Sequence, residues 1–168
     1  QAFSSTNYPF LGSLRDGVLL RYIRPDCGAY PLFYDALNTR VALLKLLPGM
    51  DRGAADYLLE RNDGLIIESF GVGGLPESGG FYHCVDEALA AGKTVVITTQ
   101  VENEGSDVGV YHVGHDLKNK LGVLEAYDMT TEAVAAKLMW ILGQTRERRE
   151  VERLFYTPVA RDILWPVE

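Results

Sequence analysis

Small and polar residues follow three of the apolar runs that the sequence predicts to be buried β-strands. They lie in the segments Pro48–Asp51, Ser69–Gly74 and Thr98–Glu104. In an open parallel sheet, the loops after the carboxyl ends of the strands line the crevice in which ligands bind. The three segments therefore have the composition of a site for a small polar ligand, and ordinary turns share that composition.

An acidic cluster follows the last of these strands. Glu102, Glu104 and Asp107 lie close together in the chain. A carboxylate at a strand end can bind the amino group of a ligand, whereas a solvated turn is the simpler interpretation of such a run. Both interpretations stay open at this point.

A metal site is poorly supported. His112 and His115 lie three apart beside Asp116, but His83 is the only other histidine and belongs to a separate predicted helix. Structural zinc usually needs four protein ligands, so surface or supporting roles suit these residues better. We predict no metal.

Motifs for nucleotides and for a nucleophilic serine are also missing. In the glycine-rich loop Gly71–Gly80, Pro76 occupies the position of the third glycine of a dinucleotide fingerprint. The sequence has no Gly-Lys-Ser or Gly-Lys-Thr phosphate loop and no nucleophile elbow. We therefore predict no cofactor.

The composition is that of one globular domain. The chain has 168 residues, of which 47% are hydrophobic and 23% charged, close to the average for soluble domains. Its net charge of −7 argues against nucleic acid or an anionic membrane as the main partner. No window approaches the roughly 18 apolar residues of a membrane span.

The two cysteines and the first residues bear on the compartment. Cys27 and Cys84 are too few for a disulfide framework, so two reduced thiols in the cytoplasm are expected, with one Cys27–Cys84 bridge as the alternative. Residues Gln1–Ser5 lack an initiator Met and the features of a signal peptide. We therefore expect the sequence to be part of a longer chain.

Four apolar runs predict the strands that would position these loops. Gly17–Ile23 is expected to be an early strand, at an edge of the sheet, that ends before Pro25. The other three are Val41–Leu47, Leu65–Ile67 and Thr94–Thr98. Their nearly continuous apolar character is typical of parallel strands that are covered on both faces.

Segments with apolar residues at helical spacing lie between these strands and after the last of them. We expect Asp51 to cap one helix, Gly92 to end a second that spans Phe81–Ala91, and Asp128 or Thr130 to cap a long third helix. The long helix should bury Val134, Leu138, Ile141 and Leu142, and Arg146–Arg153 should be a solvated charged helix. The predicted fold is one α/β domain with three layers, α/β/α, around a mostly parallel sheet of roughly four strands.

Three segments resemble the bacterial L-asparaginases, most closely the cytoplasmic type I branch. Ala2–Pro9 (Ala-Phe-Ser-Ser-Thr-Asn-Tyr-Pro) resembles the end of the first domain in that family. Gly64–Gly73 resembles the family's strand and glycine loop, and Asp128–Ala133 resembles the start of its late helix. The order and spacing of the segments agree with the family over nearly the whole chain. The resemblance implies the smaller carboxyl-terminal α/β domain at residues 25–168, preceded by an interdomain linker region with an early strand at residues 1–24.

Members of that family hydrolyse L-asparagine to L-aspartate and ammonia. Their threonine nucleophile and its partners lie in the amino-terminal catalytic domain, and no Thr-Gly-Gly-Thr-Ile or Thr-Asp-Thr run occurs here. The resemblance therefore implies that Thr98 and Thr99 are not nucleophiles and that the isolated chain is inactive.

The family also implies where a ligand would bind. Its carboxyl-terminal domain completes the active site of a neighbouring subunit, and in the secreted branch an asparagine and a glutamate do so. The position of the asparagine matches Gly49 here, so that contact is expected to be absent or made by the backbone. The corresponding glutamate falls near Glu102 or Glu104. Some cytoplasmic members of the family bind asparagine at a second, allosteric site near an Arg-Ser-Tyr-Gly run. The matching run here is Glu68–Gly71, so Glu68 stands in place of the arginine that would bind the α-carboxylate of the effector. The candidate substrate- or effector-binding residues are Gly49, Glu68, Ser69, Thr99, Gln100, Glu102 and Glu104.

The partners implied by the resemblance are L-asparagine, the amino-terminal catalytic domain and further copies in a homo-oligomer. Apolar residues near the end would suit an interface or pack on their own domain: Leu154, Phe155, Trp165 and Val167. Two alternatives remain: the asparaginase-like subunit of a tRNA-dependent amidotransferase, and a non-catalytic domain that binds a small ligand.

Overall fold

The computed structural model describes residues 8–24, 28, 30–71, 73–101, 103, 105–107 and 122–164. At its centre is a four-stranded sheet in which every pair of neighbours is parallel. The strands occur in the sheet in the same order as in the chain: β3 (Val41–Lys45), β4 (Gly64–Ser69), β5 (Thr94–Thr99) and β6 (Leu124–Glu125). All their carboxyl ends therefore lie at one edge.

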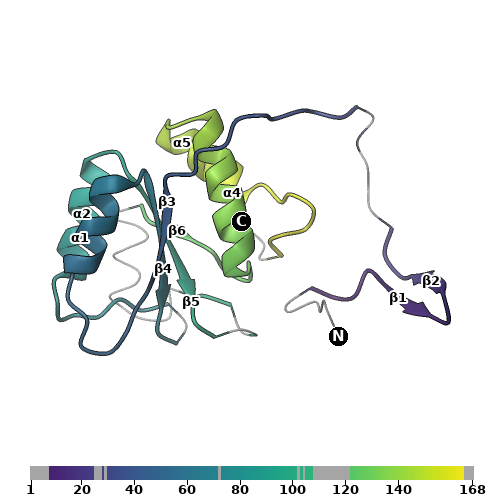
Figure 1. Ribbon diagram of the computed structural model, residues 1–168, viewed down its shortest axis with the longest axis horizontal. Coiled ribbons are helices and arrows are strands. Elements are labelled where there is room, and N and C mark those ends of the chain that lie inside the picture. The colour runs from purple at the N-terminus through teal and green to yellow at the C-terminus, as the bar shows by residue number, and fades with distance from the viewer. Residues whose placement is uncertain are drawn as a thin grey trace.

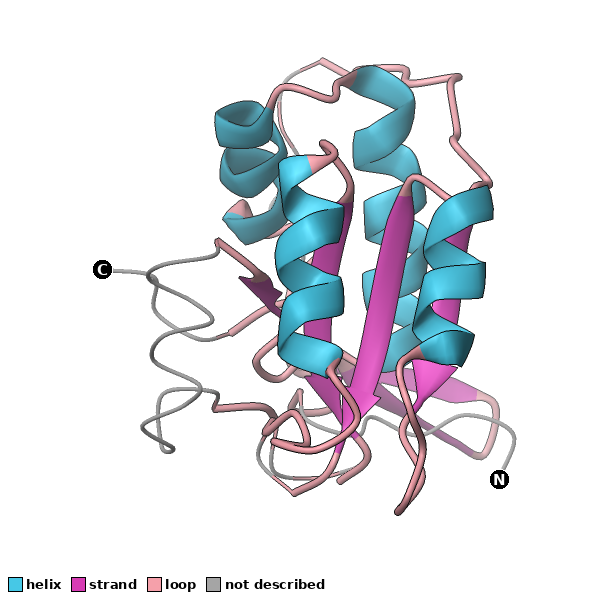
Figure 2. Ribbon diagram, turned by 90° about the vertical axis from the view of Figure 1, so that its left-hand side faces the viewer, coloured by secondary structure: helices cyan, strands magenta, loops and turns pink. Residues whose placement is uncertain are grey.

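Helices cover both faces of this sheet (Figures 1 and 2). One face carries α1 (Gly53–Arg61) and α2 (Phe81–Ala90), and the other carries α4 (Thr131–Gln144) and α5 (Arg148–Tyr156). The three-layer α/β/α architecture predicted from the sequence is confirmed.

The apolar run of β4 shows why the central strands have no alternating pattern. Leu65 and Ile67 belong to the core cluster beneath α1 and α2, whereas Ile66 belongs to the cluster beneath α4 and α5. All three side chains are fully buried. Because successive side chains point to opposite faces of a strand, a strand between two layers must be apolar at every position.

The early strand was predicted incompletely. Residues 12–21 form an antiparallel hairpin of β1 (Gly12–Arg15) and β2 (Val18–Arg21), outside the parallel sheet. Asp16 and Gly17 have φ of 50° and 79°, as a two-residue hairpin turn requires. The fourth strand of the parallel sheet is instead β6, which the sequence did not predict.

The helix ends agree with the predictions in part. The predicted cap Asp51 lies one residue before the N-cap of α1, which is Arg52 and makes no side-chain cap hydrogen bond, although the Asp51 carboxylate accepts a hydrogen bond of 2.9 Å from the Gly53 amide. In α4 the Thr130 hydroxyl caps the helix by accepting a hydrogen bond from the Ala133 amide. Gly92 follows α2 with a φ of 76°. The predicted apolar positions of α4 are buried.

The interpretation of the last helix needs correction. α5 is exposed along much of its length, but Val151 and Phe155 are buried in the core and Leu154 is partly buried. The sequence suggested Phe155 as an interface residue, whereas its ring is inaccessible to a partner. Trp165 and Val167 lie outside the described residues.

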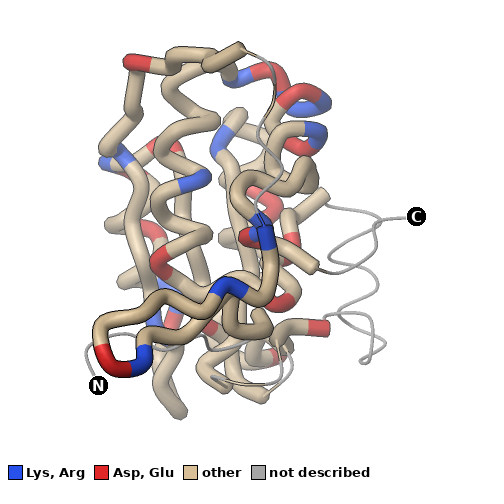
Figure 3. The backbone as a smooth tube through the Cα atoms, turned by 90° about the vertical axis from the view of Figure 1, so that its right-hand side faces the viewer, with Lys and Arg blue, Asp and Glu red and all other residues tan. Residues whose placement is uncertain are grey.

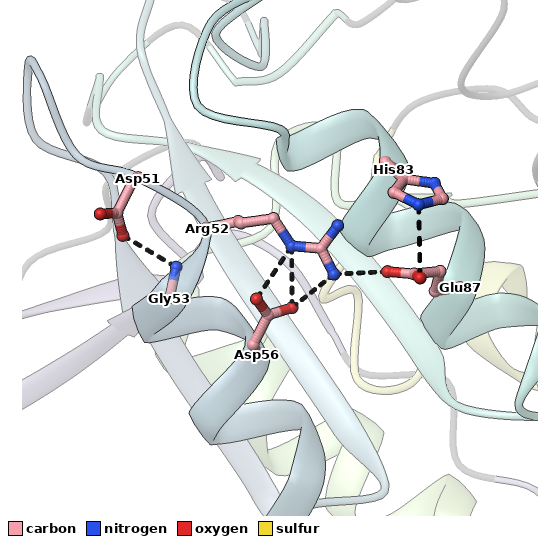
Figure 4. A network of polar contacts seen from close by, with 6 residues as sticks. All are labelled: Asp51, Arg52, Gly53, Asp56, His83 and Glu87. Atoms are coloured by element: carbon pink, nitrogen blue, oxygen red, sulfur yellow. Dashed lines mark hydrogen bonds and ion pairs between the residues drawn. The ribbon is translucent and has the colours of Figure 1, made fainter.

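A charged network joins α1 to α2 on the surface (Figure 4). The Arg52 guanidinium donates hydrogen bonds to both carboxylate oxygens of Asp56 and to Glu87. The imidazole of His83 lies 3.3 Å from Glu87. Glu87 therefore has two partners, Arg52 and His83. Figure 4 shows residues at the start of α1 and residues of α2 meeting in this network.

Cys84 in α2 is a free, buried thiol. Burial, reinforced by the hydrogen bond and charge of Asp56, raises the pKa of the Cys84 thiol to about 12 from an ordinary value of 9.0. The folded protein therefore holds the neutral thiol, and its contribution to stability is complete below pH 9 and is lost as the pH rises toward 12. Cys27 lies outside the described residues.

We predict that Cys84 is inert in the folded protein, because the thiolate is the reactive form. In a Cys27→Ser variant at pH 8, a thiol-labelling reagent should modify Cys84 about 100-fold more slowly than in guanidinium. Equal rates in the two conditions would contradict the assignment.

Candidate functional site

A pocket of about 420 Å³ opens at the carboxyl edge of the parallel sheet. Its walls come from the ends of β3, β4 and β5, from the loop after β5 and from the amino end of α4. The lining residues are Leu43, Lys45, Glu68, Thr98, Thr99, Gln100, Val101, Gly105, Met129, Thr130, Thr131 and Glu132.

The path of the chain after β6 creates this pocket. The connections through α1 and α2 lie on one face, so α4 must return across the other face, where it contacts β3 and β4 (Figure 1). The return carries the start of α4 to the edge where the strands end. Tyr127, which ends the turn after β6, has a φ of 52°, a conformation that non-glycine residues rarely adopt.

Glu68 is the central charged group of the pocket wall. Its side chain is 14% exposed. One carboxylate oxygen accepts a 2.7 Å hydrogen bond from the Thr131 hydroxyl, and the other lies 3.6 Å from the ammonium of Lys45. The carboxylate is therefore held in place between β3 and α4 while part of it still faces solvent.

Both signs of charge are present around the opening. Glu68 and Glu132 supply carboxylates, whereas Lys45, 59% exposed at its side chain, supplies a cation. The amino end of α4 adds the partial positive charge of a helix terminus. This arrangement suits a small ligand with an ammonium group and a carboxylate, since each group would meet its opposite charge.

Gln100 holds the strand ends together. Its side-chain amide donates to the carbonyl oxygens of Leu46 at 2.8 Å and Glu68 at 3.1 Å. These contacts tie the loop after β5 to the ends of β3 and β4. Gln100 thus lines the pocket, while its side-chain NH2 group is engaged by the backbone carbonyls at the strand ends.

Ser69 and Thr99 are likewise engaged by the backbone. The buried Ser69 hydroxyl donates a 2.8 Å hydrogen bond to the Thr98 carbonyl and lies outside the pocket lining. The Thr99 hydroxyl donates to the Gly71 carbonyl and accepts from the Val101 amide at 2.9 Å. Thr99 contributes to the wall, with its hydroxyl already occupied.

The remaining candidates lie elsewhere. Gly49 is exposed in the turn after β3, with a φ of 80°, and does not line the pocket. Glu102 and Glu104 lie outside the described residues. The sequence interpretation missed Lys45 and Thr131 as pocket residues. Thr131 lies in the polar start of the helix predicted after Asp128, and this polar start was the available signal. The sequence did not show that the helix begins beside the ends of the strands.

No group of three or more metal-ligating side chains occurs within the described residues. His83 is exposed and faces Glu87, while His112, His115 and Asp116 lie outside the described part of the chain. Among the described helices, none has the length and apolar character to cross a membrane.

Comparison with known proteins gives a family match. The model of the glutaminase/asparaginase C-terminal domain matches residues 40–155. An L-asparaginase of Thermococcus kodakarensis is 37% identical over 164 residues, which are 96% of this chain and 49% of that protein. A subunit of the glutamyl-tRNA(Gln) amidotransferase of Methanopyrus kandleri is 34% identical over 143 residues, 84% of this chain and 30% of that protein.

Solved structures show the same fold. The thermostable L-asparaginase from Thermococcus kodakarensis superposes with a TM-score of 0.90 at 33% identity, covering 98% of this chain and 50% of that one. L-asparaginase I from Vibrio cholerae superposes with a TM-score of 0.81 at 26% identity over the same shares. The chain thus spans about half the length of the asparaginases it matches.

Proposed function

Since the chain belongs to the glutaminase/asparaginase C-terminal domain family, we propose that it is the carboxyl-terminal domain of an L-asparaginase. In this proposal it supplies one wall of the pocket that holds L-asparagine as substrate or effector, and the catalytic groups come from an amino-terminal domain. The observation that carries the proposal is the mixed-charge pocket at the carboxyl edge of the sheet.

The state of the pocket's hydroxyl groups supports a non-catalytic wall. Thr98 is 1% exposed, and the Thr99 hydroxyl is held by two backbone partners. An activated nucleophile needs a base within hydrogen-bond reach, and neither threonine has such a partner among the described contacts. The nucleophile is therefore expected in the domain that the chain does not match.

The charges of the pocket support an amino-acid ligand. Asparagine carries an ammonium group, for which the Glu68 carboxylate is the natural acceptor, and a carboxylate, for which Lys45 and the start of α4 are suited. At the position of the arginine in the family's Arg-Ser-Tyr-Gly sequence, this chain has Glu68. An effector site here would therefore present a negative charge where the family presents a positive one.

Finer parts of the proposal follow from the resemblance. We place the protein in the type I, cytoplasmic branch, as a homo-oligomer, with residues 1–24 as the interdomain linker region and residues 25–168 as the carboxyl-terminal domain. The free, buried thiol of Cys84 suits a reducing compartment.

Asparagine hydrolysis by a hybrid protein tests the proposal. In the hybrid, this chain replaces the matching half of the Thermococcus kodakarensis L-asparaginase. We expect ammonia release from asparagine by the hybrid and none above blank from the chain alone. Replacing Glu68 with Ala in the hybrid should lower kcat/KM about 10- to 100-fold, because hydrogen bonds to charged groups are worth roughly 1.5–3 kcal/mol.

Replacement of Glu60 with Ala is the matched control, because Glu60 is a highly exposed carboxylate on α1, away from the pocket. This variant should keep the activity of the hybrid. A folded hybrid without activity, turnover by the chain alone, or equal effects of the two substitutions would contradict the proposal.

The similarity to a glutamyl-tRNA(Gln) amidotransferase supports a second candidate function. A protein of that class would release ammonia for a tRNA-dependent amidation. Amide hydrolysis that rises when tRNA and a partner protein are added would favour this candidate, whereas hydrolysis indifferent to both would favour the asparaginase.

A further inference from the structure

A smaller pocket lies at the amino edge of the parallel sheet, opposite the edge that holds the pocket described above. It measures about 70 Å³ and lies between the end of α2, the start of β5 and the start of α5. Figure 1 shows α5 at the end of the sheet away from the arrowheads of β4 and β5. About 10–15 Å³ of such volume holds one water molecule, so the pocket has room for roughly five groups of that size.

The shortness of β6 creates this space. The two residues of β6 pair with Val96 and Ile97 of β5, so within the described residues no strand lies beside Thr94 and Val95 on that side. Val95, Leu124 and Val151 line the space with buried apolar side chains. The pocket is therefore an apolar gap that continues the line of an incomplete edge strand.

Three cationic side chains surround this apolar gap. Lys93 precedes β5, while Arg146 and Arg148 lie immediately before α5 and in its first turn. Among the described lining residues, Glu152 is the one carboxylate. The whole chain carries a net charge of −7, so the balance of charge is locally inverted here. In Figure 3 the amino edge is at the top, where blue and red residues alternate along α5. An excess of one sign in a pocket attracts a ligand of the other sign.

Two of the cations are held in place by the start of β4. The Lys93 ammonium donates a 2.8 Å hydrogen bond to the Asn62 carbonyl, and the Arg146 guanidinium donates one of 2.9 Å to the Asp63 carboxylate. An ammonium has three N–H donors and a guanidinium has five. Each of these contacts uses one donor, so the cations are positioned while further donors can serve a ligand.

The third cation, Arg148, reaches the pocket over a glycine. Gly122 has a φ of 73°, and a Cβ atom at this position would collide with the Arg148 guanidinium. The guanidinium therefore occupies space that a side chain at residue 122 would fill. The first amides of α5 are capped by the Glu147 side chain, which accepts from the Arg149 and Glu150 amides. The positive charge of the pocket thus comes from side chains and not from the helix terminus.

We propose that this pocket binds a small monocarboxylate with a short apolar chain of two or three carbon atoms. Its carboxylate would accept charge-assisted hydrogen bonds from Arg148 and Lys93, and its chain would cover the apolar lining. Glu152 in the lining and Asp63 behind Arg146 offset part of the positive charge, which suits a single negative charge better than several. The site lies at the opposite edge from the mixed-charge pocket, so this inference does not depend on the proposed function.

Amide NMR spectra of the chain, with propionate as the probe, test this site. Propionate should shift the amide signals of Gly92, Thr94 and Gly122 in a saturable manner. Arg148→Gln should weaken the binding about 10-fold, because hydrogen bonds to charged groups are among the stronger ones. Arg149→Gln is the matched control, since Arg149 is the next residue of α5, is also exposed and does not line the pocket. The control variant should bind propionate as the unchanged chain does.

Two further probes separate the alternatives. Propionamide has the same shape without the charge, and equal binding of propionamide would overturn the role of the cations. Inorganic phosphate has more charge and no apolar chain, and tighter binding of phosphate would overturn the monocarboxylate in favour of a general oxyanion site. Shifts confined to Gly105 and Thr131, which line the pocket at the carboxyl edge, or no saturable shift at all, would overturn the site itself.

Discussion

Replacing Asp162 with Ala is expected to lower the free energy of unfolding by about 3–5 kcal/mol, the usual cost of leaving one partner of a buried ion pair alone. The ammonium of Lys137 lies 2.9 Å from the Asp162 carboxylate, and their side chains are 3% and 15% exposed. The ammonium keeps one other described acceptor, the Thr157 carbonyl, also at 2.9 Å. Denaturant unfolding of the variant gives the value directly.

Replacing Lys137 with Met supplies the control, because it removes the more deeply buried charge and leaves Asp162, which is more exposed and keeps the hydrogen bond from the Val159 amide. A side chain of similar length fills the space beside Phe155, whose ring lies 5.9 Å from the ammonium. We expect less than half the loss seen for Asp162→Ala, and the double variant should be more stable than Asp162→Ala alone. If Asp162→Ala costs less than about 1 kcal/mol, the pair is not effectively buried.

Replacing Phe81 with Ala should destabilise the chain by a similar amount, about 3–5 kcal/mol. Phe81 is the first residue of α2, fully buried in the cluster that joins α1, α2 and the sheet. Its removal leaves a cavity that the surrounding strands cannot fill. For a chain of this size the expected fall in Tm is roughly 10 °C, at about 2–4 °C for each kcal/mol.

Tyr57→Ala is the control for this second prediction. Tyr57 lies on the neighbouring helix α1, where it is 59% exposed and contacts Arg61. Its removal should change the free energy of unfolding by less than about 1 kcal/mol. Similar losses for the two aromatic residues would mean that the cluster beneath α2 adapts to the missing ring.

The layers of the fold could be predicted because burial leaves a simple trace in the sequence. β4 and β5 are covered on both faces, so their uninterrupted apolar runs identified them. The Thr130 cap and the Asp51 side chain at the start of α1 are local features that need no knowledge of the rest of the molecule, although Asp51 lies one residue before the N-cap Arg52. β6 has two residues, too few for any periodicity to show.

The hairpin was missed for a different reason. Its strand β1 alternates weakly, and its apolar residues face solvent in the described chain, so burial left no pattern. The Asp16-Gly17 turn was the available signal, because that pair favours a two-residue hairpin loop.

The pocket could be predicted only in part. Its floor follows from the rule that parallel strands end at one edge, which identified Thr99 and Gln100 as candidates, whereas Glu68 was identified through the family resemblance. The roles within that group depend on contacts between distant segments. The hydrogen bond from Thr131 to Glu68 joins residues 63 positions apart, and no local pattern records it.

The order of the strands has a consequence for how the chain folds. Each of β4, β5 and β6 pairs with the strand of the sheet that precedes it in the chain. When one of these strands is synthesised, its pairing partner is therefore already present. From β3 to β5 the loops to be closed are those of single strand–helix–strand units, whose entropic cost is small. The sheet can therefore grow one unit at a time during synthesis, from β3 onward. The exception is α4, which must return to β3 and β4, so the pocket is completed only when this last, longest closure is made.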